Sequence, residues 1–232
     1  MKRFWREVTV ESRGAGFGVA LDGRPIRTQG GAAQVVPGHA LAEGLAGEWR
    51  AQGDEIDPKG FALRDLADFA IDHVLPNPAA AATRALAYAE ADTLCYRADP
   101  DEPLYRRQQQ LWEPLLQAVE AHHHVRLERV SGIVHRAQPA ESLATLRAAI
   151  LGLDAFALAA LETLTKLAAS LTIGLLAIEP GADADALFAA ANCEQDWQAE
   201  QWGWEWQAEE DRARRLAAFR NAARFAQLAR AP

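Results

Sequence analysis

The segment from Glu194 to Trp206 concentrates carboxylates and indole rings, the side chains in this sequence best suited to chemistry or binding. It contains four of the seven tryptophans of the chain. On a helix, Asp196 and Glu200 lie four residues apart on one face, and Gly203 is a suitable terminator. Two carboxylates that hydrolyse a glycoside must face each other across the substrate, which neighbours on one helix face do not do. The segment therefore favours a partner-binding surface, since tryptophan suits interfaces and carboxylates pair with a partner's arginines.

A purely structural interpretation of this segment stays open. The rings could seal the end of a helical bundle while the carboxylates are solvated, because tryptophans are heavily buried in most folds.

Other candidate motifs lack the neighbours that their chemistry needs. The glycine-rich stretch 14–18 is followed by a β-type run, not by the helix N-terminus that binds phosphate. His122 to His124 are consecutive, so on a helix they point about 100° apart and cannot converge on one metal ion. Ser170 has no G-x-S-x-G motif, and Cys95 has no identifiable base. We therefore expect no catalytic residue, no metal site and no cofactor.

The composition is that of a globular protein, with 50% hydrophobic and 24% charged residues. The net charge of -8 argues against a nucleic-acid partner, which needs a basic surface. The most apolar stretch, 156–178, contains Glu162 and Lys166, so it predicts a buried helix and no membrane insertion. Arg6 and Glu7 interrupt any signal-peptide pattern, and only two cysteines occur, which favours a reducing compartment. No transit-type pattern precedes Phe4, so we expect a bacterial cytoplasmic protein, or a mitochondrial matrix protein if the chain is a processed eukaryotic one.

The first forty residues have the pattern of a small antiparallel sheet. Runs at 8–11 and 18–21 are β-type, the Asp22-Gly23 pair suits a tight hairpin turn, and 26–28 and 34–36 can supply further strands. Leu41, Leu45 and Trp49 then recur at helical spacing, as do apolar residues over 61–74, so two helices are expected to cover the sheet.

The rest of the chain is predicted to be helical. The two prolines in 76–78 mark a domain boundary, which gives an α+β domain over 1–76 and a helical domain over 77–232. One stretch, 125–130, alternates apolar and charged residues, and this strand periodicity could return it to the N-terminal sheet. The predicted helices span residues 79–94, 103–123, 140–152, 155–178, 183–202 and 205–228. The fold class is therefore α+β, a small antiparallel sheet with covering helices followed by a mainly α-helical domain.

An ordered set of short segments runs along nearly the whole chain. The segments are 17–28, Glu48-Trp49 with Gln52, Leu66-Ala67, 70–72, Tyr88-Ala89, 92–97, Arg107-Gln108, Trp112, 196–198 and 201–203. Together they resemble one family, the ATP-twelve chaperones, also called ATP synthase assembly factor two, and the chain is identified as a bacterial member of that family.

The resemblance implies a function without a cofactor and without catalysis. Members of the family bind the unassembled α subunit of ATP synthase, shield its aggregation-prone surface, and give way when the β subunit arrives. The resemblance also implies a fold of an N-terminal α+β unit and a C-terminal helical unit. We expect the chain to be a monomer with the α subunit as its partner.

Two groups of site residues follow as hypotheses. The α-subunit site is expected to include Glu194, Asp196, Gln198, Glu200 and Trp202. The residues expected to hold the fold are Trp49, Asp92, Tyr96, Arg97, Trp112, Trp197 and Gly203. Three positions depart from the family pattern and inherit no role from it: Gln195, where an acidic residue is expected, and Trp204 and Trp206, which are additional.

Two rival interpretations remain, a small-molecule enzyme with an acidic interdomain cleft and a structural subunit of a permanent complex. A deep polar pocket lined by Asp92, Arg97 and Glu194 would favour the enzyme, whereas an exposed aromatic patch would favour the chaperone.

Overall fold

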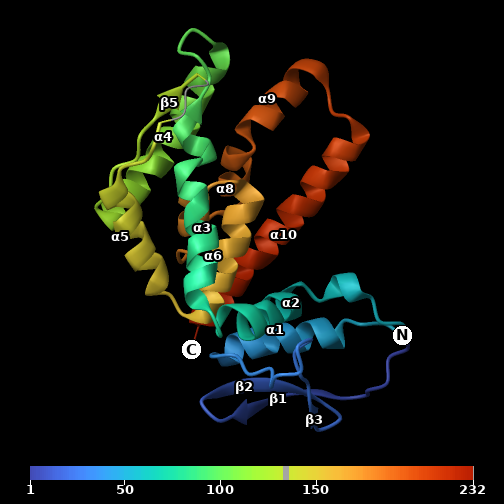
Figure 1. Cartoon of the computed structure of the whole chain (residues 1–232). Helices are drawn as coiled ribbons and strands as arrows, with labels where there is room; N and C mark the ends of the chain where they lie inside the picture. Colours follow the sequence, from blue (N-terminus) through green and yellow to red (C-terminus); the bar gives the residue numbers. More distant parts are fainter. Residues whose placement is uncertain (133–135, 232) are drawn as a thin grey trace.

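The computed structural model describes residues 1–132 and 136–231. A three-stranded sheet and two helices lie at one end of the molecule, and a helical bundle rises from them (Figure 1). The predicted fold class is confirmed: a small antiparallel sheet is followed by a mainly helical region.

The N-terminal sheet has the strand order β1-β2-β3, and both pairings are antiparallel. Its strands are β1 (Val8–Arg13), β2 (Gly16–Leu21) and β3 (Arg24–Pro25). Asp22 and Gly23 connect β2 to β3 with positive φ angles of 49° and 74°, as expected for a tight hairpin turn. The strands predicted at 26–28 and 34–36 are reduced to isolated bridges, Arg27 with Ala33 and Phe17 with Val36.

Two helices, α1 (His39–Arg50) and α2 (Ala62–Phe69), lie between the sheet and the bundle (Figure 1). α1 packs on β1 and β2, and its buried Leu41 and Leu45 join the same core cluster as Val19. A single π-helical turn, Ala70–Val74, continues α2 towards the bundle. β2 is buried along nearly its whole length, and the helical period of α1 turns the apolar face of that helix towards it.

The bundle contains eight helices among the described residues, and it departs from the prediction at two breaks and at the end of its first helix, which stops at Glu90 although the predicted helix runs to 94. The predicted helix over 155–178 is interrupted at Ala169, which has a left-handed φ of 49°, and Ser170 then caps the next helix by accepting from the Ile173 N–H. The predicted helix over 183–202 is interrupted at Asn192. The helices are α3 (Pro78–Glu90), α4 (Pro103–His123), α5 (Ala140–Leu151), α6 (Ala155–Ala168), α7 (Leu171–Ala177), α8 (Ala184–Ala191), α9 (Cys193–Trp202) and α10 (Trp206–Arg230).

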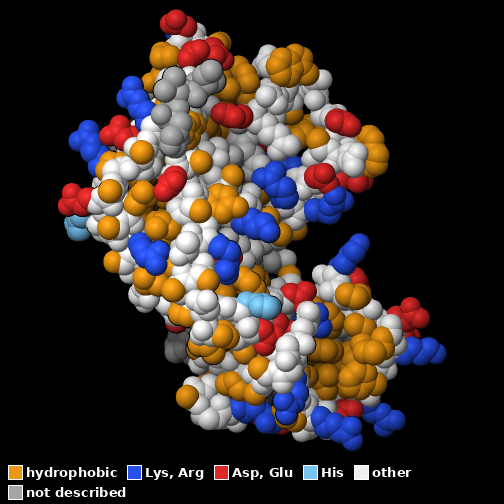
Figure 2. All heavy atoms as spheres, in the orientation of Figure 1, with side chains coloured by type: hydrophobic (Ala, Val, Ile, Leu, Met, Phe, Trp, Pro, Cys, Tyr) orange, Lys and Arg blue, Asp and Glu red, His pale blue; other side chains and the backbone are white. Residues whose placement is uncertain are grey.

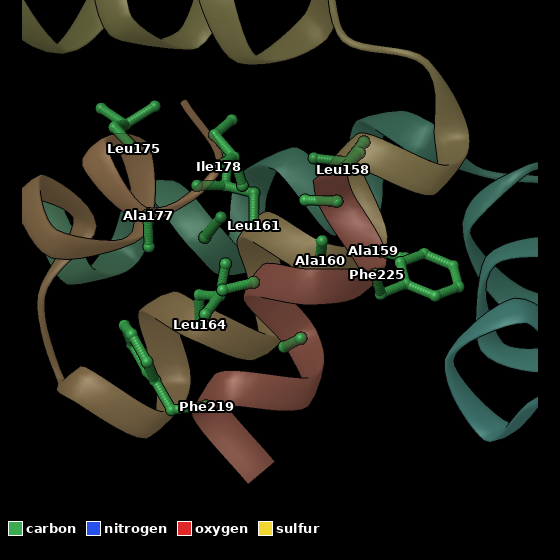
Figure 3. Close-up of a cluster of buried hydrophobic side chains, with 14 of the residues drawn as sticks. Leu158, Ala159, Ala160, Leu161, Leu164, Leu175, Ala177, Ile178, Phe219 and Phe225 are labelled. Atoms are coloured by element: carbon green, nitrogen blue, oxygen red, sulfur yellow. The ribbon is translucent and has the colours of Figure 1, made fainter. Parts of the chain in front are cut away.

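Helix α6 occupies the centre of the bundle. Its Leu158, Leu161 and Leu164 are fully buried, and they lie among side chains of α7 and α10, including Phe219 and Phe225 (Figure 3). A helix that is apolar on nearly all sides belongs in the middle of a helical layer. The apolar stretch that the sequence assigned to a buried helix is therefore the core of the bundle.

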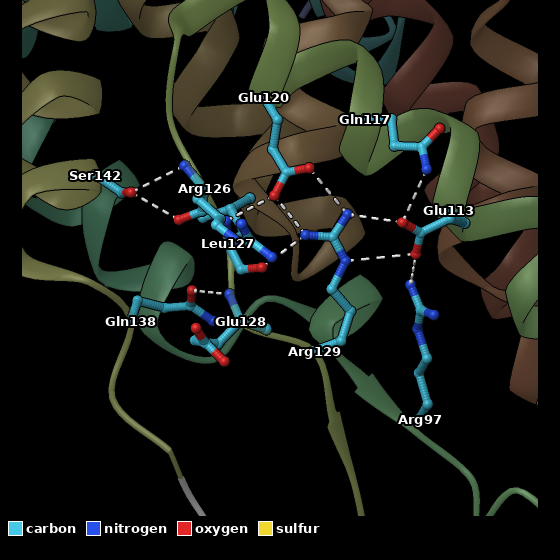
Figure 4. A network of polar contacts seen from close by, with 10 residues as sticks. All are labelled: Arg97, Glu113, Gln117, Glu120, Arg126, Leu127, Glu128, Arg129, Gln138 and Ser142. Carbon is cyan, nitrogen blue, oxygen red and sulfur yellow. Dashed lines mark hydrogen bonds and ion pairs between the residues drawn. The ribbon is translucent and has the colours of Figure 1, made fainter.

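The segment 125–130 does not join the N-terminal sheet, contrary to the possibility raised by its alternating pattern. Only its end is a strand: β5 (Val130–Ser131) pairs in parallel with β4 (Tyr96–Arg97) inside the helical region. One of its charged side chains, Arg129, contacts α4 instead. Arg129 donates to the carboxylates of Glu113 and Glu120, at 3.0 Å from Nη2 to each (Figure 4). The alternation of apolar and charged residues thus predicts an extended segment correctly, but it does not identify the strand with which that segment pairs.

Candidate functional surface

Helices α9 and α10 form a hairpin that projects from the bundle, with residues 203–205 at its tip (Figure 1). Gly203 ends α9 with a φ of 83°, which favours glycine. Cys193, at the base, is the one buried residue of α9. An apolar core therefore anchors α9 at its base only.

Two ion pairs hold α9 along the rest of its length. Arg212 of α10 donates from Nε and Nη2 to the carboxylate oxygens of Asp196, at 2.7 and 2.6 Å. Arg107 of α4 donates from Nη2 to Oε1 of Glu200 at 2.7 Å, and its Nη1 bonds the other oxygen. The hydrogen bond from Arg107 lowers the pKa of Glu200, so this carboxylate stays ionised at neutral pH. Both carboxylates that share a face of α9 are thus bonded within the chain.

A second stripe of side chains along α9 is exposed. Glu194, Gln198 and Trp202 follow one another at intervals of four residues, and all three are exposed. Glu194, at the start of the stripe, also accepts a hydrogen bond of 2.8 Å from Nε2 of the buried Gln108. Partial burial raises the pKa of Glu194, and the bond from Gln108 offsets part of this effect.

The tip carries large apolar side chains in solvent. Trp202 is 80% exposed and Trp206 is 69% exposed, whereas Trp204 is 38% exposed and lies 5.8 Å from the guanidinium of Arg212. Figure 2 shows hydrophobic side chains at the tip of the hairpin, on both sides of the connection. Exposed rings of this size make the tip a candidate interaction surface. The family resemblance assigns no role to Trp206. The sequence feature that indicates this residue is the close spacing of three tryptophans around Gly203.

The hairpin is strongly acidic as well as aromatic. Residues 194–211 contain seven Asp or Glu residues and no Lys or Arg. Arg107 and Arg212, which neutralise Glu200 and Asp196, both come from outside this segment. The surface therefore offers indole rings surrounded by carboxylates.

The sequence also matches the model of a known protein family. The sequence model described as "ATP12 chaperone protein" matches residues 2–120, which is just over half of the chain. The chain belongs to the ATP12 chaperone family.

Relatives agree with this membership over the full length. Atp12 from Paracoccus denitrificans, solved also as a point mutant, is 38% identical, with a TM-score of 0.94 over 99% of this chain and 98% of that one. The Atu1473 protein from Agrobacterium tumefaciens is 36% identical, with a TM-score of 0.93 over 97% of this chain and 85% of that one. A mitochondrial relative, protein atp12 from Schizosaccharomyces pombe, is 23% identical over 87% of this chain and 74% of its own length.

The residues that the family resemblance assigned to the fold lie at junctions between elements. Asp92 accepts from the Ser170 hydroxyl at 2.6 Å and from the Thr172 N–H at 2.8 Å, and so ties the end of α3 to α7. Trp112 is fully buried on α4, and its Nε1 donates to the carbonyl of Ala190 on α8 at 2.8 Å.

The other residues expected to hold the fold are less buried, except for Arg97. Arg97 is buried, and its Nη2 donates to Glu113 at 2.7 Å. Tyr96 is half-buried, and its hydroxyl donates to the carbonyl of Glu90 at 3.3 Å. Trp49 is half-buried against the rings of Trp5 and Phe61, and Trp197 lies half-buried under the guanidinium of Arg107, 5.7 Å from it.

The three residues that would line an enzyme's polar pocket are not brought together in this member of the ATP12 family. Asp92 bonds to α7, Arg97 to Glu113, and Glu194 to Gln108. Burial raises the pKa of the Cys95 thiol to about 12, so it stays protonated at neutral pH. Within residues 1–132 and 136–231, no group of three or more His, Cys, Asp or Glu side chains is arranged to hold a metal ion. The helices of these same residues lack the length and hydrophobicity of a transmembrane span.

Proposed function

We propose that this chain is an assembly chaperone that binds the unassembled α subunit of ATP synthase, shields its aggregation-prone surface, and is displaced by the β subunit. Membership of the ATP12 chaperone family supports the general role. The observation that carries the proposal is the projecting hairpin, whose Trp202 and Trp206 are exposed at its tip. A binding protein without catalytic activity, acting as a monomer in the bacterial cytoplasm, accounts for this arrangement.

The chemistry of the hairpin suits a partner that must later leave. Two or three exposed indole rings supply apolar contact area, and the carboxylates around them form a polar rim. A small aromatic interface with a polar rim gives moderate affinity, because much of the binding free energy offsets the entropy lost on association. A β subunit that buries more surface against α would then compete successfully.

We assign different roles to the five residues of the proposed site. Trp202, Gln198 and Glu194 face solvent and would touch the α subunit directly. Asp196 and Glu200 would act through the ion pairs that hold α9 in place. Trp206 joins the contacting set because its ring is exposed at the start of α10, next to the tip.

Co-expression with the α subunit tests this function. The chain carries an affinity tag and is purified from cells that express the α subunit alone, or the α and β subunits together. We expect the α subunit to co-purify in the first case and to be largely lost in the second. Failure to capture the α subunit in either case would refute the proposal.

A further inference from the structure

A second apolar surface lies at the opposite end of the molecule from the hairpin tip. It is a groove of about 590 Å³ between the N-terminal residues, the chain around β3, and helices α1 and α2. Figure 2 shows hydrophobic side chains gathered over this end of the molecule, with Lys and Arg side chains around them. The residues that line the groove are Phe4, Leu21, Asp22, Arg24, Pro25, Ile26, Arg27, Thr28, Gln29, Trp49, Arg64 and Asp68.

The floor of the groove is apolar and rigid. Trp49 and Ile26 are half-buried there, and Trp49 is fixed between the rings of Trp5 and Phe61, with centroid distances of 5.0 and 4.6 Å. Phe4 forms an exposed wall, with 67% of its surface in solvent. A preformed floor beside an exposed ring can accept one or two large apolar side chains.

The rim of the groove is cationic. Arg24 and Arg27 are exposed, and the Arg24 side chain makes no hydrogen bond or ion pair with any described residue. The guanidinium of Arg64 lies 4.0 Å from the ring centroid of Phe61 and pairs with the exposed Asp65. Residues 1–27 contain six Lys or Arg against three Asp or Glu, although the whole chain has a net charge of -8.

The two carboxylates in the groove are already engaged. Asp22 accepts from the backbone N–H groups of Arg6 and Glu7, at 3.0 and 2.8 Å. Asp68 is buried, accepts from the Gln29 N–H at 3.1 Å, and also bonds to Gln34. These bonds hold the carboxylates in place without removing their charges, and the lining of the groove carries three arginines, Arg24, Arg27 and Arg64, against these two carboxylates, an excess of positive charge.

The sheet edge beside the groove does not favour strand addition. β3 is two residues long and ends in Pro25, which has no N–H to donate. Recognition at this surface must rely on side chains, which is the mode that arginines around an apolar floor provide.

We propose that this groove binds an acidic and apolar segment of the client polypeptide. A large apolar side chain lies on the floor of Trp49 and Ile26, and carboxylates next to it pair with Arg24 and Arg27. The acidic hairpin and the basic groove then receive different segments, since their charges are opposite. This inference rests on the proposed chaperone function, which supplies a polypeptide partner.

Fluorescence anisotropy with a synthetic peptide tests the inference. The probe is a fluorescein-labelled peptide of Glu-Leu-Phe-Glu repeats, and its control has Ser in place of Leu and Phe. The full chain is compared with Arg24→Glu/Arg27→Glu, with Phe4→Ala, and with Arg106→Glu, which changes an exposed arginine on α4. Circular dichroism checks that each variant is folded.

We expect saturable binding of the apolar peptide to the wild-type chain, and much weaker binding of the Ser peptide. The double variant should weaken binding by about tenfold or more, Phe4→Ala by about threefold or more, and Arg106→Glu by less than about twofold. No saturable binding, or equal loss with Arg106→Glu, would overturn the inference. The assay contains no ATP synthase subunit, so this failure is distinct from a failure to capture the α subunit.

Discussion

Arg212 and Asp196 join the two helices of the projecting hairpin through a pair of hydrogen bonds, 2.7 and 2.6 Å long. Side chains of both residues are about four-fifths covered, with 20% and 19% exposed. The same guanidinium lies near the rings of Trp204 and Phe188. Because α9 has a buried residue only at its base, the ion pair between Arg212 and Asp196 is important for the position of the hairpin tip.

Replacing Arg212 with alanine should loosen α9 without unfolding the bundle. We expect faster amide hydrogen exchange along α9, weaker capture of the α subunit, and a loss in unfolding free energy of about 1 kcal/mol. Arg214→Ala is the matched control, because Arg214 pairs with Asp211 on the exposed surface of α10.

A charge swap separates positioning by Asp196 from direct contact with the partner. Asp196→Arg combined with Arg212→Asp can rebuild the pair with its charges reversed. If Asp196 acts by positioning α9, the swapped chain regains both slow amide hydrogen exchange along α9 and capture of the α subunit. Slow amide exchange without capture of the α subunit would instead show that the Asp196 carboxylate itself contacts the α subunit.

The buried carboxylate of Asp92 should be important for stability. It accepts from the Ser170 hydroxyl, the Thr172 N–H and the Leu94 N–H. Asp92→Ala would leave buried donors without an acceptor, and we expect the free energy of unfolding to fall by about 3 kcal/mol in urea denaturation. Asp92→Asn, which keeps one acceptor oxygen, should lower the free energy of unfolding by less than Asp92→Ala. An equal loss in the two variants would contradict the role of these hydrogen bonds.

The ion-pair network on α4 should make stability depend on acidic pH. Burial alone would raise the pKa values of Glu113 and Glu120, but hydrogen bonds from Arg129, joined at Glu113 by one from Arg97, outweigh it and lower both values. A lowered folded pKa gives stability that is present above the unfolded pKa, about 4.5, and lost as the pH falls through the folded value.

A double variant isolates this contribution. Glu113→Gln/Glu120→Gln should be less stable than the wild type by about 1–3 kcal/mol at pH 7, and the difference should shrink as the pH falls below about 4.5. Urea denaturation at a series of pH values measures it. A difference that is independent of pH would show that these carboxylates do not stabilise the fold through their charges.

Local signals were enough to predict much of the fold. The sequence predicts the Asp22-Gly23 turn and the limits of α4, Pro103 and His123, because turn residues and proline act locally. It does not predict the breaks at Ala169 and Asn192, since apolar residues keep helical spacing across both.

The hairpin surface was only partly predictable. Its location followed from the density of rings and carboxylates in 194–206. Helical spacing predicts that Asp196 and Glu200 share one face of a helix. It does not show that Arg212 pairs with Asp196 and Arg107 with Glu200, and Arg107 lies far from this segment in the sequence. Long-range pairing of this kind depends on tertiary packing, as it does for the segment 125–130.

The most direct test of the account is quantitative capture of the α subunit by a chain that lacks the exposed rings. Trp202→Ala/Trp206→Ala removes side chains that are 80% and 69% exposed, so its melting temperature should match that of the wild type. Leu75→Ala, which removes a 60% exposed leucine away from the hairpin, is the control. We predict that the double variant binds the α subunit about tenfold or more weakly while the control binds normally. Equal binding by a folded double variant would contradict the claim that the hairpin tip is the client-binding surface.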